Sequence, residues 1–113
     1  MKAISDEYMR EMLTRAKPYC LLIVKPGPQR DAPGADQIIW EHGRRNFALR
    51  AEGLLPIVCP VGDGSDIAGI GILDAGALDD VHELMRDDPA VKEGVLVYEL
   101  HPCRGFPGDA LPE

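Results

Sequence analysis

The sequence predicts an α+β fold in which helices cover one face of an antiparallel sheet. After a leading helical segment, the hydrophobic pattern changes in the order strand, helix, strand, strand, helix, strand. The two middle strands flank the glycine-rich segment Gly62-Asp63-Gly64-Ser65-Asp66, which is typical of a hairpin turn. This split βαβ order places both helices on the same side of the sheet.

The first elements are a helix and a buried strand. Residues 4–16 have apolar side chains at helical spacing, with acids in the first turn and bases toward the end. Pro18 is expected to stop this helix. The next run, Tyr19 to Val24, is apolar on both faces and too short for a helix, so it predicts a central strand.

The long second helix and the hairpin follow. Apolar spacing predicts a helix from Ala35 to Glu52, which Gly53 closes. The hairpin strands are predicted within 54–61 and 67–74. Because strand side chains alternate, Gly69 and Gly71 leave one face of the second strand bare, and we expect another part of the structure to approach that face closely.

The last elements complete a ferredoxin-like βαββαβ fold with a four-stranded antiparallel sheet. Ala77 to Asp87 has the pattern of a core-facing helix, and Val95 to Leu100 predicts the final strand. From Pro102 onward there is no periodicity, so residues 103–113 are expected to form a tail, and residues 1–17 an N-terminal helical extension. The sheet face without helices carries apolar residues and predicts a homodimer, which a two-fold axis would close into a dimeric α/β barrel.

Length and charge exclude several classes of protein. At 113 residues and 12.3 kDa the chain forms one domain, so a two-domain enzyme is excluded and no cofactor is expected. Nineteen acids against twelve Lys and Arg give a net charge of -7, which disfavours nucleic acid and anionic membrane surfaces. The apolar run of residues 19–24 is far shorter than the roughly 20 residues that span a bilayer.

The chain start and the cysteines predict a cytoplasmic protein. Asp6 and Glu7 stand where a signal peptide needs its apolar stretch. The three cysteines are odd in number and widely spaced, which favours free thiols in a reducing compartment, with Cys20 and Cys59 buried. His101 and Cys103 have no second pair at zinc-site spacing, so no metal is expected.

His42 is the first candidate for chemistry. A helix turning about 100° per residue places it between Leu49 and Asn46, at the core edge. An unsatisfied buried polar group costs about 1 to 3 kcal/mol, so the ring needs a hydrogen-bond partner. Asn46, one turn later, is a local candidate. The alternatives are a structural histidine satisfied by the backbone or by Asn46, and a histidine that acts on a ligand.

Asp88 and Arg45 are the other candidates. Asp88 immediately before Pro89 is the pattern of an N-cap followed by proline at the first helical position. A carboxylate there can also reach an imidazole and select which ring nitrogen faces a substrate. Arg45 lies close enough to the His42 side of its helix to meet an anionic ligand, although a solvated face is its ordinary role.

Two motifs in this order resemble the YCII-related family. The first runs from His42 over eleven positions to Gly53 and continues into an apolar strand that reaches Pro60. The second consists of Asp88-Pro89-Ala90-Val91-Lys92-Glu93-Gly94 followed by Val97-Tyr98-Glu99-Leu100-His101-Pro102. The likeness extends from Tyr19 to Pro102, which is 84 of the 113 residues. The chain departs from the family pattern in its leading helix, in its tail, and at Cys59, where a glycine often precedes the proline.

The resemblance implies a single YCII-like domain over residues 1–113, similar in fold to muconolactone isomerase. It also implies a dimer with a His-Asp active site in each subunit, which falls on His42 and Asp88 here. Family relatives are connected to breakdown of cyclic or aromatic compounds by elimination or isomerisation without a cofactor.

Three functions are compatible with these residues. The first is a small cofactor-free lyase or isomerase, in which His42 and Asp88 do acid-base work while Arg45 and Asn46 help to bind the substrate. The second is a non-catalytic or accessory dimeric module that holds a small ligand in the same pocket. The third is an interaction scaffold, in which His42 only packs and Asp88 only caps a helix.

Overall fold

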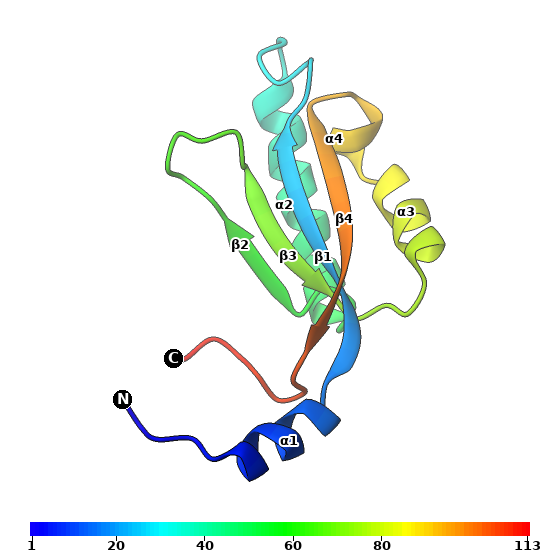
Figure 1. Cartoon of the computed structure of the whole chain (residues 1–113). Helices are drawn as coiled ribbons and strands as arrows, with labels where there is room; N and C mark the ends of the chain where they lie inside the picture. The colour runs from blue at the N-terminus through cyan, green and yellow to red at the C-terminus, as the bar shows by residue number, and fades with distance from the viewer.

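The computed structural model describes residues 1–113, and it has the predicted α+β architecture (Figure 1). Its elements in chain order are α1 (Asp6–Thr14), β1 (Lys17–Pro26), α2 (Ala35–Ala51), β2 (Ile57–Pro60), β3 (Gly69–Leu73), α3 (Leu78–Arg86), α4 (Pro89–Lys92) and β4 (Leu96–Gly105). None of the helices combines the length and the apolar character that crossing a membrane requires.

The four strands form one antiparallel sheet in the order β2-β3-β1-β4, so the ferredoxin-like prediction is confirmed. β1 is central and pairs with β3 on one side and with β4 on the other. The hairpin of β2 and β3 forms through the predicted glycine-rich turn.

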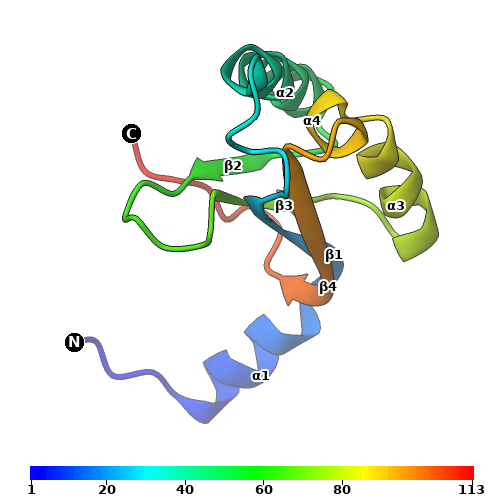
Figure 2. The same ribbon diagram turned by 90° about the horizontal axis from the view of Figure 1, so that it is seen from above.

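Three helices cover a single face of this sheet. Figure 2 shows α2, α3 and α4 on one side, with α1 on the opposite side. Along β1 the side chains alternate, and Cys20, Leu22 and Val24 are buried beneath the helices. The core consists of these three residues and Ala35, Leu49, Leu55, Leu73, Val81, Met85, Ala90, Val95 and Leu96.

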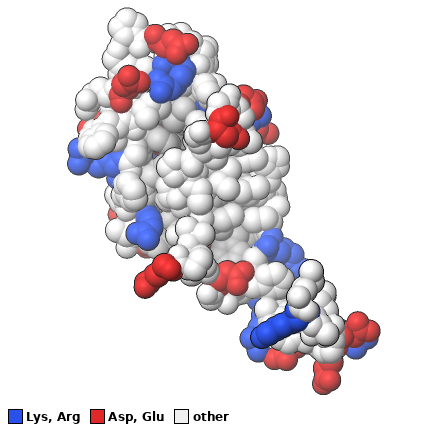
Figure 3. Space-filling view, turned by 90° about the vertical axis from the view of Figure 1, so that its left-hand side faces the viewer, with Lys and Arg blue, Asp and Glu red and all other residues white.

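The other face of the sheet has no helix packed along it. Leu21 and Ile23 of β1 point to this face and are only partly buried, and Val97 of β4 is 43% exposed. Seen from the β2 side of the molecule, a broad area without charged side chains lies between charged groups that gather mainly toward the two ends (Figure 3). We call the sheet face that contains Leu21, Ile23 and Val97 the open sheet face.

The bare face of β3 is closely approached, as predicted. A Cβ atom on Gly71 would lie 2.9 Å from a methyl carbon of Leu55 and 3.2 Å from the carbonyl oxygen of Ile57. There is no room for a side chain at this position, and the glycine lets the loop between α2 and β2 close onto the sheet.

Two boundaries differ from the sequence prediction. β4 continues to Gly105 instead of ending near Leu100, so its last residues pair with the first half of β1 and the tail begins after Gly105. Pro102 lacks an N–H donor, but β4 is an edge strand, where proline is tolerated. The boundary between the first helix and the first strand also differs. α1 already ends at Thr14, and Pro18 lies near the start of β1 instead of stopping the helix.

The termini and cysteines complete the description. α1 begins after Ser5, whose side chain accepts a hydrogen bond from the backbone N–H of Tyr8 at 3.1 Å, and none of its residues is buried. All three cysteines are free thiols. Cys20 is buried as predicted. The prediction that Cys59 is buried is wrong, because Cys59 lies on the short edge strand β2, where it pairs with the half-exposed Ile70 of β3.

The loop after β1 provides a test of the packing. The backbone N–H of Gly27 donates to the carbonyl oxygen of Val95 at 2.8 Å, and a Cβ atom on Gly27 would overlap the carbonyl oxygen of Gly94. We expect Gly27→Ala to lower the free energy of unfolding by about 1 to 3 kcal/mol, the usual cost of overpacking. Gly62→Ala is the control, because a Cβ atom there meets nothing within 4 Å. Equal urea midpoints for the two variants would contradict this packing.

Candidate active site

A histidine and an aspartate from different helices meet at the centre of the helical layer. His42 lies in the middle of α2, and Asp88 is the N-cap residue of α4, 46 positions later. The distance between His42 Nδ1 and Asp88 Oδ2 is 2.7 Å, so the two side chains form a hydrogen bond. A carboxylate can only accept, so Nδ1 carries the proton and Nε2 is the second, acceptor nitrogen of the neutral ring.

Asp88 caps its helix and holds the imidazole at the same time. Its Oδ1 atom accepts from the backbone N–H of Ala90 at 2.8 Å, while Oδ2 accepts from His42. Pro89 occupies the first helical turn, as the Asp-Pro pattern predicted. Asp88 has no exposed surface, so two directional hydrogen bonds fix its carboxylate. Asp88 therefore caps α4 and contacts the imidazole with the same carboxylate.

Asn46 contacts the opposite nitrogen of the ring. Its Nδ2 atom lies 3.1 Å from His42 Nε2, and the amide donates to the lone pair of that nitrogen. Together, Asp88 and Asn46 hold the imidazole in one tautomer and one orientation. The side chain of His42 remains 12% exposed, on the side that faces a cavity.

Arg45 lies on the side of the His-Asp pair that faces α3 and α4, away from the pocket. Its Nη2 atom donates to the carbonyl oxygen of Leu84 at 2.6 Å, and its Nη1 atom is 3.7 Å from Asp88 Oδ2. Arg45 is not among the residues that line the cavity, so the structure places it toward α3 and α4 rather than toward a ligand. Periodicity within α2 could not predict this direction, because the position of α3 and α4 decides it.

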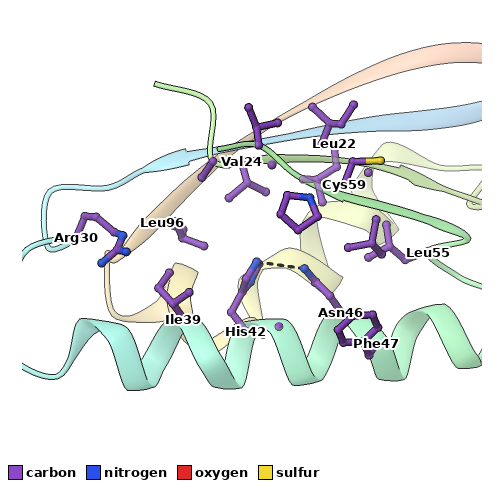
Figure 4. Close-up of a pocket in the computed structure, with 18 residues that line it drawn as sticks. Leu22, Val24, Arg30, Ile39, His42, Asn46, Phe47, Leu55, Cys59 and Leu96 are labelled. Carbon is purple, nitrogen blue, oxygen red and sulfur yellow. Dashed lines mark hydrogen bonds between the residues drawn. The ribbon is translucent and has the colours of Figure 1, made fainter. Parts of the chain in front are cut away.

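An open pocket of about 390 Å³ lies between α2 and the sheet, and Figure 4 shows its lining. His42, Gly43, Asn46 and Phe47 form the helix side. The sheet side is mainly apolar and includes Leu22, Val24, Val58, Pro60, Gly69 and Gly71. The two β3 glycines present only backbone atoms to this wall of the pocket.

The other histidines and the buried cysteine lie outside this pocket. Nδ1 of His82 is 2.9 Å from the hydroxyl oxygen of Tyr98, which ties α3 to β4. Nε2 of His101 is 3.6 Å from a carboxylate oxygen of Glu99 on the same strand. No three His, Cys, Asp or Glu side chains gather in a way that could hold a metal ion. Burial raises the pKa of the Cys20 thiol, which disfavours the nucleophilic thiolate.

One pocket residue, Arg30, has no signal in the sequence analysis. It lies in the loop between β1 and α2, and its side chain lines the pocket. Loops have no hydrophobic periodicity that could indicate which side chains turn inward. The place of Arg30 in the pocket follows only from the position of the loop over the sheet.

Comparisons with known proteins give likenesses of structure alone. No protein-family model matches the chain, and no curated protein matches it. A solved structure that is similar is 5-chloro-2-hydroxyhydroquinone dehydrochlorinase from Burkholderia phenoliruptrix AC1100 in complex with 2,5-dihydroxybenzoquinone. The two chains share 22% sequence identity over 73% of this chain and 90% of the other, with a TM-score of 0.48. These values do not carry the enzyme's activity over to this chain.

The structure therefore defines a class of protein by its own features. It is a small α+β protein with a ferredoxin-like sheet and a His-Asp pair beside an open, mainly apolar pocket. The resemblance to the YCII-related family stays a prediction from the sequence motifs.

The hydrogen-bond pattern predicts the tautomer of His42 in a variant. In Asp88→Asn, the amide oxygen can still cap Ala90, so the amide nitrogen faces the ring and can only donate. We expect the proton of neutral His42 to move from Nδ1 to Nε2. The ¹⁵N chemical shifts of the two ring nitrogens measure this change. The same tautomer in wild type and Asp88→Asn would contradict the assigned hydrogen bond.

Proposed function

We propose that this chain is a small acid-base enzyme, a lyase or isomerase that acts without a cofactor on a small cyclic or aromatic compound. The observation that carries the proposal is the 2.7 Å contact between His42 and Asp88, with the imidazole at the wall of an open pocket. A histidine with a buried carboxylate on one nitrogen and a ligand-sized space beside it has the arrangement of a general base.

His42 takes a proton from the substrate through Nε2 in this mechanism. The Asn46 amide occupies that nitrogen in the structure, so substrate binding must displace it or share the site. Asp88 holds the Nδ1 proton and stabilises the imidazolium that forms when Nε2 becomes protonated. The imidazolium can then return the proton to another atom of the same substrate, which gives isomerisation, or to a leaving group, which gives elimination.

Arg45 acts as a positioning residue. Its guanidinium places a positive charge 3.7 Å from the Asp88 carboxylate and binds the carbonyl end of α3 at Leu84. It thereby links α2, α3 and α4 around the carboxylate. We propose this role for Arg45 in place of direct substrate binding. Asn46 stays a proposed substrate-binding residue because it lines the pocket.

The pocket walls suit a flat, apolar ring. Phe47 and Ile39 on α2 face Leu22 and Val58 on the sheet across the cavity. Apolar walls offer van der Waals contact to the faces of such a ring and bury its surface. The motif resemblance to the YCII-related family supports the same class of substrate.

Replacement of His42 tests the activity. Wild-type protein is incubated in D₂O with a panel of small cyclic ketones, lactones and halogenated dihydroxybenzenes, and ¹H NMR measures the loss of substrate proton signals. We expect the protein to exchange protons of some panel compounds for deuterium or to catalyse an elimination from them. We expect His42→Gln to lower the rate about 10²- to 10⁴-fold, the usual contribution of a general base, with substrate affinity nearly unchanged. His82→Gln is the control, because His82 contacts Tyr98 outside the pocket.

Two results would overturn the enzyme proposal. One is a His42→Gln variant with the same rate as wild type. The other is saturable binding of panel compounds with no product from any of them, which would indicate the ligand-binding or accessory module instead.

A homodimer is part of the proposal. The open sheet face has apolar side chains both in the centre of the sheet, at Ile23, and near its edge, at Val97. Lys25 and Glu99 form an ion pair on the same face. Large exposed apolar faces of soluble proteins commonly form contacts between subunits, and a two-fold axis would cover both copies at once.

Sedimentation tests the homodimer. Wild type should sediment at twice the chain mass of 12.3 kDa. Ile23→Lys should sediment as a monomer, because it places a charge in the middle of the proposed interface. Trp40→Lys is the control and should stay dimeric, because Trp40 is an exposed residue on α2, outside the open sheet face. A monomeric wild type, or a dimeric Ile23→Lys, would contradict the pairing through this face.

A further inference from the structure

We propose that Arg30 forms an anion-binding end of the pocket, so that the ligand carries a carboxylate or phenolate group. The proposal deepens the proposed function and rests on it for the identity of the pocket as the substrate site. Its own evidence is the charge of the pocket lining, the position of Arg30 and the rigidity of the loop that carries it.

The charge of the pocket lining is opposite to that of the whole protein. The chain has nineteen Asp and Glu residues and a net charge of -7, yet none of these acids lines the pocket. Arg30 is its only Lys or Arg side chain, and His42 and Asn46 supply the other polar side chains. A cationic ligand would find no counter-charge here, whereas an anionic ligand finds a guanidinium.

Arg30 and the His-Asp pair lie at different places in the pocket. Figure 4 shows Arg30 toward one end, beside Leu96 and Ile39, while His42 and Asn46 lie farther along α2. A ligand that contacts both groups must therefore have an apolar body between its anionic group and the carbon that loses a proton. A ring with a carboxylate or phenolate substituent has this form.

The guanidinium of Arg30 can be recruited by a ligand. Its Nη1 atom is 3.1 Å from Oδ1 of Asp36, whose side chain is 95% exposed. Exposed ion pairs contribute little to stability because water competes for both charges. An anion in the partly enclosed pocket would be screened less than Asp36, and a planar guanidinium can bind it through two parallel hydrogen bonds.

The loop that carries Arg30 is held at its base. The backbone N–H groups of Gly27 and Gln29 donate to the carbonyl oxygens of Val95 and Gly94 at 2.8 and 2.9 Å. The N–H of Arg30 itself donates to the carbonyl oxygen of Gly27 at 3.1 Å. The backbone of Arg30 is thus fixed against the start of β4, so a ligand needs to order only its side chain.

Benzoate and benzamide test this site, because they have the same shape and differ in charge. Binding to the full-length protein is followed by NMR shifts of backbone amides along the pocket, in wild type, Arg30→Gln, Arg30→Lys and the control Arg44→Gln. Arg44 is exposed, pairs with Glu41 at 3.1 Å and does not line the pocket. Amide spectra also show whether each variant is folded.

We expect wild type and Arg44→Gln to bind benzoate more tightly than benzamide. Arg30→Gln should weaken benzoate about tenfold or more, the effect of losing a charge-assisted hydrogen bond, and leave benzamide unchanged. The benzoate affinity of Arg30→Lys should lie between those of wild type and Arg30→Gln, because lysine keeps the positive charge but lacks the planar guanidinium. These binding results are independent of turnover, so they can succeed even if His42→Gln shows that the acid-base proposal fails.

Three results would overturn the anion site. The first is equal affinity of wild type for benzoate and benzamide. The second is unchanged benzoate affinity in folded Arg30→Gln. The third is the absence of pocket shifts with either compound.

Discussion

The hydrogen bond between His42 and Asp88 is the constraint on which the site depends. It joins the middle of α2 to the N-terminus of α4, and its acceptor is a carboxylate without exposed surface. Because Oδ1 of Asp88 is already engaged by the backbone of Ala90, the second oxygen has a defined direction. The helix cap thus orients the imidazole, and local helix chemistry becomes the geometry of a candidate active site.

The sheet supplies the space that the pair requires. Gly69 and Gly71 present only backbone on the face of β3 that α2 covers, and they line the pocket that reaches the imidazole of His42. At Gly71 a Cβ atom would lie only 2.9 Å from a methyl carbon of Leu55, so the glycine is required for this close packing. The glycines of one short strand therefore allow both close packing and a pocket wall without side chains.

Much of the fold could be predicted from the sequence, because periodicity and turn residues are local signals. His42 on the inner side of its helix and Asp88 as a cap were predictable for this reason, but their contact was not, since 46 positions separate them. The direction of Arg45 depends on where α3 packs. The far half of β4 was missed because Pro102 suggested a break, which an edge strand tolerates.

The site brings an imidazole, polarised by a buried carboxylate, to the wall of a cavity of ligand size. A high-resolution crystal structure at neutral pH measures this arrangement most directly. We expect His42 Nδ1 within hydrogen-bond distance of Asp88 and the Nε2 edge of the ring beside an open pocket. An imidazole turned away from Asp88, or a pocket filled by side chains of the protein, would contradict it.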